Sequence, residues 1–123
     1  MKLNKYRRGE YNGRLVTELD KGRLSYELKR LFWLLAQDIS GQKRYQYLRE
    51  EVKEVIALRG YESCATFWNK YNPEKYNREK ETGSPYAYFS IVIRSAAAQV
   101  IRDVAKEKEI VDADFKLGND ENI

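Results

Sequence analysis

The segment SPYAYFSIVIRSAAAQVIRDVAKEK, residues 84–108, predicts a long amphipathic helix and with it the fold class of the chain. Ser84 offers a capping hydroxyl, and Pro85 suits the first helical position, where its missing N–H costs nothing. Apolar residues then recur three and four positions apart, which places them on one face of a helix. That face comprises Phe89, Ile93, Ala96, Ala97, Val100 and Val104. Because the alanines let a neighbouring helix approach closely, we expect this helix, ending near Lys108, to pack in a bundle.

Three earlier segments also show the helical period. A short helix is expected over Arg14–Lys21, ended by Gly22 in the left-handed conformation. A second helix starts near Ser25. Its apolar face comprises Leu28, Leu31, Phe32, Leu35 and Ile39. A third helix is expected over Tyr47–Tyr71, and Gly60 in its interior indicates close packing or a kink. Since alternating strand patterns are nearly absent, the sequence predicts an all-α, compact bundle of four main helices.

The chain of 123 residues has the length and composition of a single domain, with 42% hydrophobic and 34% charged residues. Its charge is uneven, because residues 1–30 hold nine Lys and Arg against four Asp and Glu, whereas residues 101–123 hold four against seven. We expect a flexible basic N-terminus over residues 1–13, a helical domain over 14–110 and a flexible acidic tail over 111–123. The basic N-terminal and central parts of the chain indicate either a polyanionic partner or ordinary surface solvation.

The cellular location is predicted from what the sequence lacks. No apolar run approaches the roughly 18 residues of a membrane-spanning helix, and the N-terminus has no apolar core typical of a signal peptide. Cys64 is the single cysteine, so the chain cannot form an internal disulfide. These features favour a cytoplasmic protein without a membrane partner.

Catalysis is difficult to build from these residues. The chain has no histidine, the usual general base near neutral pH, and no Gly-rich phosphate loop. Glu50, Glu51 and Glu54 could face a metal ion, but a solvated helix face paired with nearby cations is the favoured interpretation. The sequence therefore predicts a binding protein, not an enzyme, with no catalytic residues, no metal and no cofactor.

Cations and aromatic rings gather between the third and fourth predicted helices. The cations are Lys70, Lys75, Arg78 and Lys80, and the rings are Tyr71, Tyr76, Tyr86 and Tyr88. Cations neutralise phosphates and rings stack on unpaired bases, so this combination favours binding of opened nucleic acid. The alternative is that the rings belong to the core. We favour the core for Tyr71 and Phe89, and exposure for Tyr76, Tyr86 and the loop cations.

Two segments resemble a known family. They are ESCATFWNKYNPEK (62–75) and SPYAYFSIVIRSAAAQVIRDVAKEKE (84–109), which are similar to conserved region 2 of bacterial sigma factors. The closest resemblance is to the small late-transcription sigma factors of large tailed bacteriophages. The shared pattern is a helix ending in aromatic-Asn-x-aromatic, then Asn-Pro-Glu-Lys, then Pro-aromatic-Ala-Tyr-Phe opening an aliphatic helix. The front segment LVTELDKGRLSYELKRLFWLLAQDIS (15–40) also looks like that family, so the resemblance covers about residues 14–110.

The resemblance implies a phage sigma factor that acts in the cytoplasm of an infected bacterium. Sigma region 2 docks on the clamp helices of the largest subunit of core RNA polymerase. It also recognises an AT-rich promoter element upstream of the start site and holds flipped bases of the opened strand. The polymerase-binding residues carried over by position are Val55, Leu58, Arg59, Tyr61, Glu62 and Ala65. The DNA-binding residues, with the loop, are Lys75, Tyr76, Arg78, Lys80, Tyr86, Tyr88, Ile91, Val92, Arg94, Ser95, Gln99 and Arg102.

The implied partners are core RNA polymerase and promoter DNA, and a phage coactivator or the replication sliding clamp would be a further partner. In the phage family a short C-terminal segment can bind the sliding clamp. For DADFKLGNDENI (112–123) an unstructured acidic tail is the favoured alternative. A different class of protein also fits the sequence: a small helical DNA-binding or adaptor protein that does not associate with RNA polymerase.

Overall fold

The computed structural model describes the backbone of residues 8–121 and the side chains of residues 9–108. The chain folds into four α-helices: α1 (Arg8–Leu19), α2 (Tyr26–Ser40), α3 (Glu50–Phe67) and α4 (Pro85–Glu121). Short 3₁₀ turns lie at Lys43–Tyr45, Trp68–Lys70 and Pro73–Lys75. Over residues 8–121 the chain forms no strand beyond one isolated pair, Asn77 with Thr82. The prediction of a compact all-α bundle is therefore confirmed.

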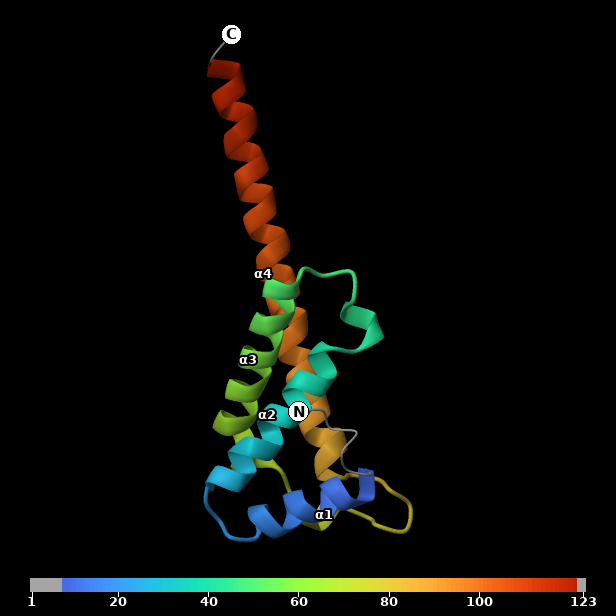
Figure 1. Ribbon diagram of the computed structural model, residues 1–123. Helices are drawn as coiled ribbons and strands as arrows, with labels where there is room; N and C mark the ends of the chain where they lie inside the picture. Colours follow the sequence, from blue (N-terminus) through green and yellow to red (C-terminus); the bar gives the residue numbers. More distant parts are fainter. Residues whose placement is uncertain (1–7, 122–123) are drawn as a thin grey trace.

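Helix α1 lies across one end of the bundle, beside the start of α4, and α4 extends past the other helices at the opposite end (Figure 1). Helix α3 packs against both α2 and α4. Although α4 is long, no helix within residues 8–121 combines the length and apolar character needed to cross a bilayer.

The second helix forms as predicted. Ser25 is its N-cap, and the Ser25 hydroxyl accepts a hydrogen bond of 3.1 Å from the backbone N–H of Leu28. All five residues of the predicted apolar face are fully buried, because the spacing of three and four turns them toward the same side. Gly22, just before this helix, has a φ of 69°, the left-handed conformation expected of it.

Three helices differ from the predictions in where they begin or end. Helix α1 begins at Arg8 instead of residue 14. Residues 8–13 are therefore helical, although they were expected to be flexible. Residues 1–7 lie outside the described part of the chain. Tyr11 and Leu15 are fully buried, and their packing outweighs the low helix propensity of the nearby glycines. Helix α3 is shorter than expected, because 3₁₀ turns precede and follow it. Helix α4 runs to Glu121, beyond the expected end near Lys108.

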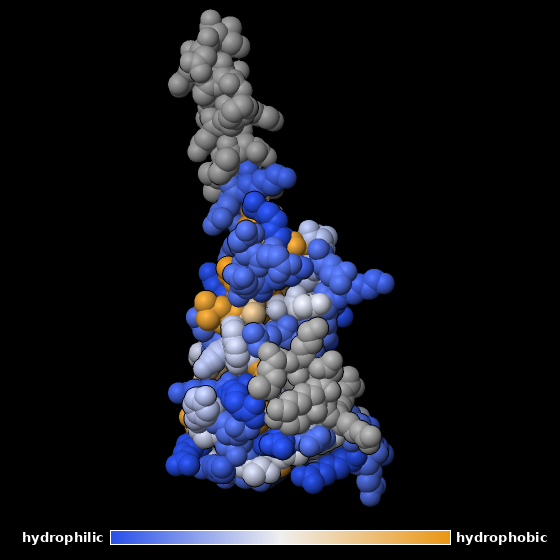
Figure 2. Space-filling model, in the orientation of Figure 1, coloured by the Kyte–Doolittle hydropathy of each residue, from blue (hydrophilic) through white to orange (hydrophobic). Residues whose placement is uncertain are grey.

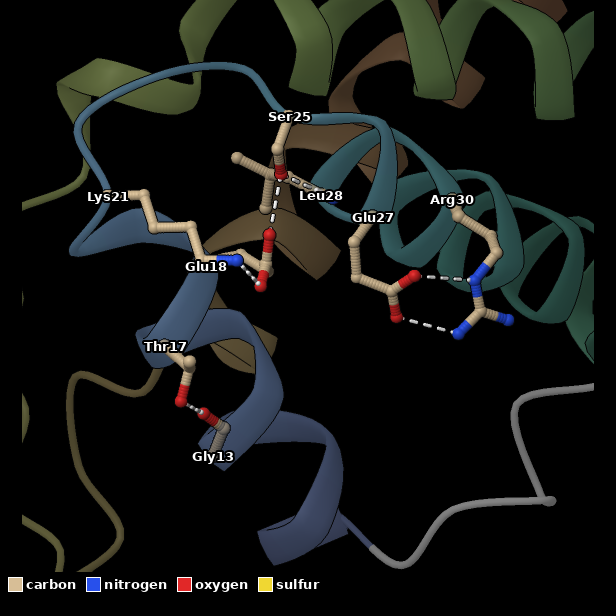
Figure 3. A network of polar contacts seen from close by, with 8 residues as sticks. All are labelled: Gly13, Thr17, Glu18, Lys21, Ser25, Glu27, Leu28 and Arg30. Carbon is tan, nitrogen blue, oxygen red and sulfur yellow. Dashed lines mark hydrogen bonds and ion pairs between the residues drawn. The ribbon is translucent and has the colours of Figure 1, made fainter.

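A polar network joins α1 to α2 at the corner between them (Figure 3). The Glu18 carboxylate accepts hydrogen bonds of 2.7 Å from both the Lys21 ammonium and the Ser25 hydroxyl. Glu27 accepts two bonds from Arg30, of 2.7 and 2.9 Å, within the first turns of α2. On the buried side of the same corner, the Tyr11 hydroxyl donates to the Leu31 carbonyl at 2.8 Å. These contacts fix the orientation of α1 relative to α2.

The contact between α3 and α4 is the most extensive in the bundle, and Gly60 lies within it. A Cβ atom at this position would lie 2.7 Å from Cγ2 of Ile93, so only glycine allows α4 to approach this far. One turn further along α3, the Cys64 thiol lies 3.9 Å from the Phe89 carbonyl. Of the two roles predicted for Gly60, close packing is therefore the one observed, and α3 continues through it as one helix.

Replacing Gly60 tests this packing. We expect Gly60→Ala to lower the free energy of unfolding by about 1–3 kcal/mol, because the new methyl group would overlap Ile93 and force the helices apart. Ile93→Val in the same chain should recover part of the loss. Gly13→Ala is the matched control, since Gly13 is exposed in α1 with nothing within 4 Å of the added Cβ, and it should stabilise the chain slightly. Urea denaturation measures all three, and equal effects of Gly60→Ala and Gly13→Ala would contradict the packing argument.

The Glu18 network predicts a pH dependence of stability. Hydrogen bonds from Lys21 and Ser25 lower the pKa of Glu18 from its ordinary value of 4.5. A carboxyl whose pKa is lowered by folding stabilises the folded chain above the ordinary pKa, and this contribution disappears as the pH falls through the lowered pKa. Glu18→Gln should therefore cost about 1 kcal/mol at pH 7 and nothing at a pH well below 4.5. Glu10→Gln, an exposed change in the same helix, is the control, and a pH-independent cost of Glu18→Gln would contradict this account.

Candidate nucleic-acid and protein interfaces

The loop between α3 and α4 is anchored to the bundle by Tyr71. The Tyr71 ring is buried against Tyr88 and Phe89, with ring centroids 5.3 and 5.8 Å away. Its hydroxyl donates a 2.7 Å hydrogen bond to the carbonyl of Gly83, at the far end of the loop. Gly83 has a φ of 68° and lies against the backbone of Lys75, which leaves no room for a side chain. The two ends of the loop are thereby held together over the core.

The tip of this loop is a tight, hydrogen-bonded turn. Asn77 and Thr82 exchange backbone hydrogen bonds of 2.8 and 3.2 Å. The Asn77 side-chain oxygen accepts bonds from the backbone N–H groups of Glu79 and Lys80, at 3.0 and 3.1 Å. Glu81 has a positive φ of 54°, which closes the turn. The loop therefore presents its side chains from a defined backbone.

The predicted loop cations are exposed, but the loop is not basic overall. Lys75, Arg78 and Lys80 all reach solvent, as expected. They alternate with three carboxylates, so residues 72–84 carry three positive and three negative side chains. The carboxylates are Glu74, Glu79 and Glu81. Over residues 72–84 the positive and negative side chains therefore balance. Tyr76 is half-buried, and the Arg78 guanidinium lies 5.7 Å from the centre of its ring.

The tyrosines at the start of α4 are less exposed than expected. Tyr86 is half-buried and meets the Tyr11 ring edge-on, with centroids 6.0 Å apart. Its backbone N–H donates a 2.8 Å bond to the side-chain oxygen of Asn12, which ties α1 to α4. Tyr88 is half-buried between Tyr71 and Phe89. The core assignment of Tyr71 and Phe89 is confirmed, since they are 8% and 0% exposed.

Most of the predicted DNA-binding residues of α4 share one face of the helix. At about 100° per residue, six of them fall within one side of α4, opposite the buried side of Phe89 and Ile93. These six are Tyr88, Ile91, Val92, Ser95, Gln99 and Arg102, which we call the outer face of α4. Ile91 is 62% exposed, and Arg102 donates to the Gln99 side chain at 2.9 Å.

Arg94 and Tyr86 lie on other sides of α4. Arg94 is half-buried, and its Nε is buried without a hydrogen-bond partner among the described residues. One turn earlier the buried Ser90 hydroxyl also has no partner within this part of the chain. The structure thus separates Arg94 and Tyr86 from the outer face of α4, because at about 100° per residue they point about 110° and 170° away from the middle of that face.

The predicted polymerase-binding residues lie on the outward side of α3. Val55 and Leu58 are 40% and 51% exposed, Arg59 and Glu62 are exposed, and Ala65 is half-buried. Tyr61 instead turns toward α2, where its ring meets the Trp33 ring edge-on at 5.7 Å. The visible face of the molecule in Figure 2 is mostly hydrophilic, with small hydrophobic areas, one of them at the left where α3 runs in Figure 1.

Two residues of this region were not predicted from the sequence. Trp33 and Tyr26 of α2 line a hollow of about 340 Å³ together with Leu58 and Tyr61 of α3. Tyr26 is 82% exposed and Trp33 is 37% exposed. The signal that could have identified Trp33 is its position, because it falls outside the apolar stripe of α2 and such a large apolar residue on the polar side of a helix indicates a contact surface.

The remaining reactive group is Cys64, which is fully buried. Burial raises the pKa of its thiol to about 12, so the thiol stays protonated near neutral pH and is a poor nucleophile. Among the residues whose side chains are described, no three His, Cys, Asp or Glu side chains are grouped so that they could hold a metal ion.

No family model matches this chain, and comparisons with curated proteins and with solved structures also find no match.

Removing the Tyr71 hydroxyl tests whether it orders the loop. Tyr71→Phe deletes the bond to the Gly83 carbonyl, so the loop amides of residues 75–83 should exchange hydrogen faster, by up to about tenfold for a bond worth about 1 kcal/mol. Amides of α2 should be unaffected. Tyr76→Phe, in the same loop, is the matched control and should leave exchange unchanged. Unchanged exchange in Tyr71→Phe would show that the turn around Asn77 orders the loop by itself.

Proposed function

We propose that this chain is a phage-type sigma factor, which attaches to core RNA polymerase and directs it to late promoters by recognising and opening an AT-rich upstream element. In this proposal the outward side of α3 contacts the clamp helices of the polymerase. The outer face of α4 and the loop at residues 72–84 contact promoter DNA. The chain contributes no catalytic group, so its role is to position the DNA.

The observation that carries the proposal is the placement of two exposed surfaces on two tightly packed helices. Val55, Leu58 and Glu62 point outward from α3, and Ile91 and Arg102 point outward from α4. Because Gly60 lets these helices touch, the two surfaces have a fixed relative orientation. A subunit that must hold DNA in register with a much larger enzyme needs such a rigid connection. The ordered loop beside α4 adds exposed cations to the proposed DNA surface.

The outer face of α4 offers both kinds of contact that an opened strand requires. Gln99 and Ser95 can form hydrogen bonds with base edges, and Arg102 can pair with a phosphate. Tyr88 and Ile91 offer apolar surface for an unstacked base, and stacking on an aromatic ring contributes about 1–3 kcal/mol per base. Tyr88 is half-buried, so only part of it is accessible for such a contact.

A second candidate function is that of a small helical DNA-binding or adaptor protein that does not bind RNA polymerase. The balanced charge of the loop and the half-burial of Tyr86 and Tyr88 favour it, because both reduce the surface available for an opened strand. The hollow between Trp33 and Leu58 also suits a protein partner other than RNA polymerase.

Two charge reversals on different helices distinguish these functions. The purified chain should be retained by immobilised bacterial core RNA polymerase, and the complex should prefer DNA with a preformed AT-rich bubble over the same duplex. Glu62→Lys on α3 should weaken polymerase binding about tenfold, as expected for a residue within an interface. Arg102→Glu on α4 should leave polymerase binding intact and weaken binding of the bubble DNA, with a reduced salt dependence.

The matched control is Arg23→Glu, an exposed reversal in the connection between α1 and α2, which should change neither measurement. If the chain binds free duplex DNA equally well with and without polymerase, it is a small DNA-binding protein that acts without RNA polymerase, as in the second candidate function. If polymerase does not retain it at all, the sigma proposal is overturned.

A further inference from the structure

A furrow runs along the boundary between α2 and α3, and Trp33 divides it into two hollows. The first, of about 340 Å³, is lined by Tyr26, Lys29, Arg30, Trp33, Leu58 and Tyr61. The second, of about 380 Å³, is lined by Trp33 and by residues further along α2 and nearer the start of α3. From the first hollow to the second, the residue numbers increase along α2 and decrease along α3, because the two helices are antiparallel. The two hollows therefore form one continuous surface.

The two ends of the furrow carry opposite charge. Lys29 and Arg30 border the first hollow; Arg30 already pairs with Glu27 at 2.7 Å, so Lys29 leaves a net positive charge there. Glu50, Lys53 and Glu54 border the second, and Lys53 already pairs with Glu50 at 2.9 Å, which leaves a net negative charge there. Between these ends the surface is apolar, since Trp33 and Leu58 are both exposed by more than a third.

We propose that this furrow binds an amphipathic helix of another protein whose charges are segregated, with acidic residues at one end and basic residues at the other. An apolar side chain at the centre of that helix would pack against Trp33 and Leu58. The acidic end would lie over Lys29 and the basic end over Glu54, so the charge pattern fixes the direction in which the helix lies. A groove between two parallel ridges suits a helix, because helix side chains pack into such grooves.

This inference shares Leu58 and Tyr61 with the proposed polymerase-binding surface and adds to it the kind of partner segment that would bind there. It does not depend on DNA binding. It can therefore be tested with the isolated chain and a synthetic peptide, without polymerase or promoter, so that its failure is distinguishable from failure of the sigma proposal.

The probe is a designed helical peptide of about 16 residues with a central leucine, Glu at one end and Lys at the other. Two comparison peptides have the same leucine, one with Glu and Lys interleaved and one with Lys throughout. Fluorescence anisotropy of the labelled peptides measures affinity, and the NMR signal of the Trp33 indole N–H reports the place of binding. The segregated peptide should bind about tenfold more tightly than the interleaved one and should shift the Trp33 signal.

Three variants of the chain sharpen the test. Leu58→Glu should weaken binding of the segregated peptide about tenfold, whereas Ile91→Glu, a matched change of an exposed aliphatic residue on α4, should not. Lys29→Glu makes both ends of the furrow acidic, so it should move the preference from the segregated peptide to the all-Lys peptide. Circular dichroism verifies that each variant is folded, as expected for changes at exposed positions.

Three results would overturn the proposal. The first is equal binding of the segregated and interleaved peptides, which would remove the charge argument. The second is binding that leaves the Trp33 signal unmoved. The third is a dimer of the chain, detected by sedimentation and abolished by Leu58→Glu, which would show that the furrow is occupied by a second copy instead.

Discussion

The approach of α4 to α3 at Gly60 is the constraint on which the rest of the structure depends. With no side chain at this position, Ile93 fits directly against the backbone of α3. The same register brings Cys64 beside Phe89 and, beyond the end of α3, Tyr71 beside Tyr88. Tyr71 then holds the loop through the Gly83 carbonyl. One missing Cβ therefore fixes the position of two helices and of the loop that joins them.

The helices that bury a regular apolar stripe could be predicted from the sequence. Helix α2 is the clearest case, because its cap at Ser25 and its five stripe residues are local features that need no knowledge of the rest of the chain. The start of α1 could not be predicted in this way. Gly9 and Gly13 each disfavour a helix by about 1 kcal/mol, and the packing of Tyr11 against α2 that compensates for them depends on the tertiary structure.

The candidate surfaces were predictable to a similar degree. The outer face of α4 follows from the helical period, which places Ser95, Gln99 and Arg102 on one side of the helix. The burial of Tyr86 could not be anticipated, because it results from Tyr11 and Asn12, which lie more than seventy residues earlier in the chain. The role of Trp33 was missed for the same reason, since the furrow exists only once α3 lies beside α2.

The charges on the proposed DNA surface have a consequence for how the chain would bind DNA. Double-stranded DNA is held mainly by neutralising its phosphates, and the affinity rises with the number of cations that contact them. The loop cations are offset by an equal number of carboxylates, and Arg102 is the single cation of the outer face of α4. Affinity of the isolated chain for duplex DNA should therefore be low. A protein with this surface can act on DNA effectively only when a partner supplies most of the binding free energy, and the exposed apolar residues of α2 and α3 offer the surface for such a partner.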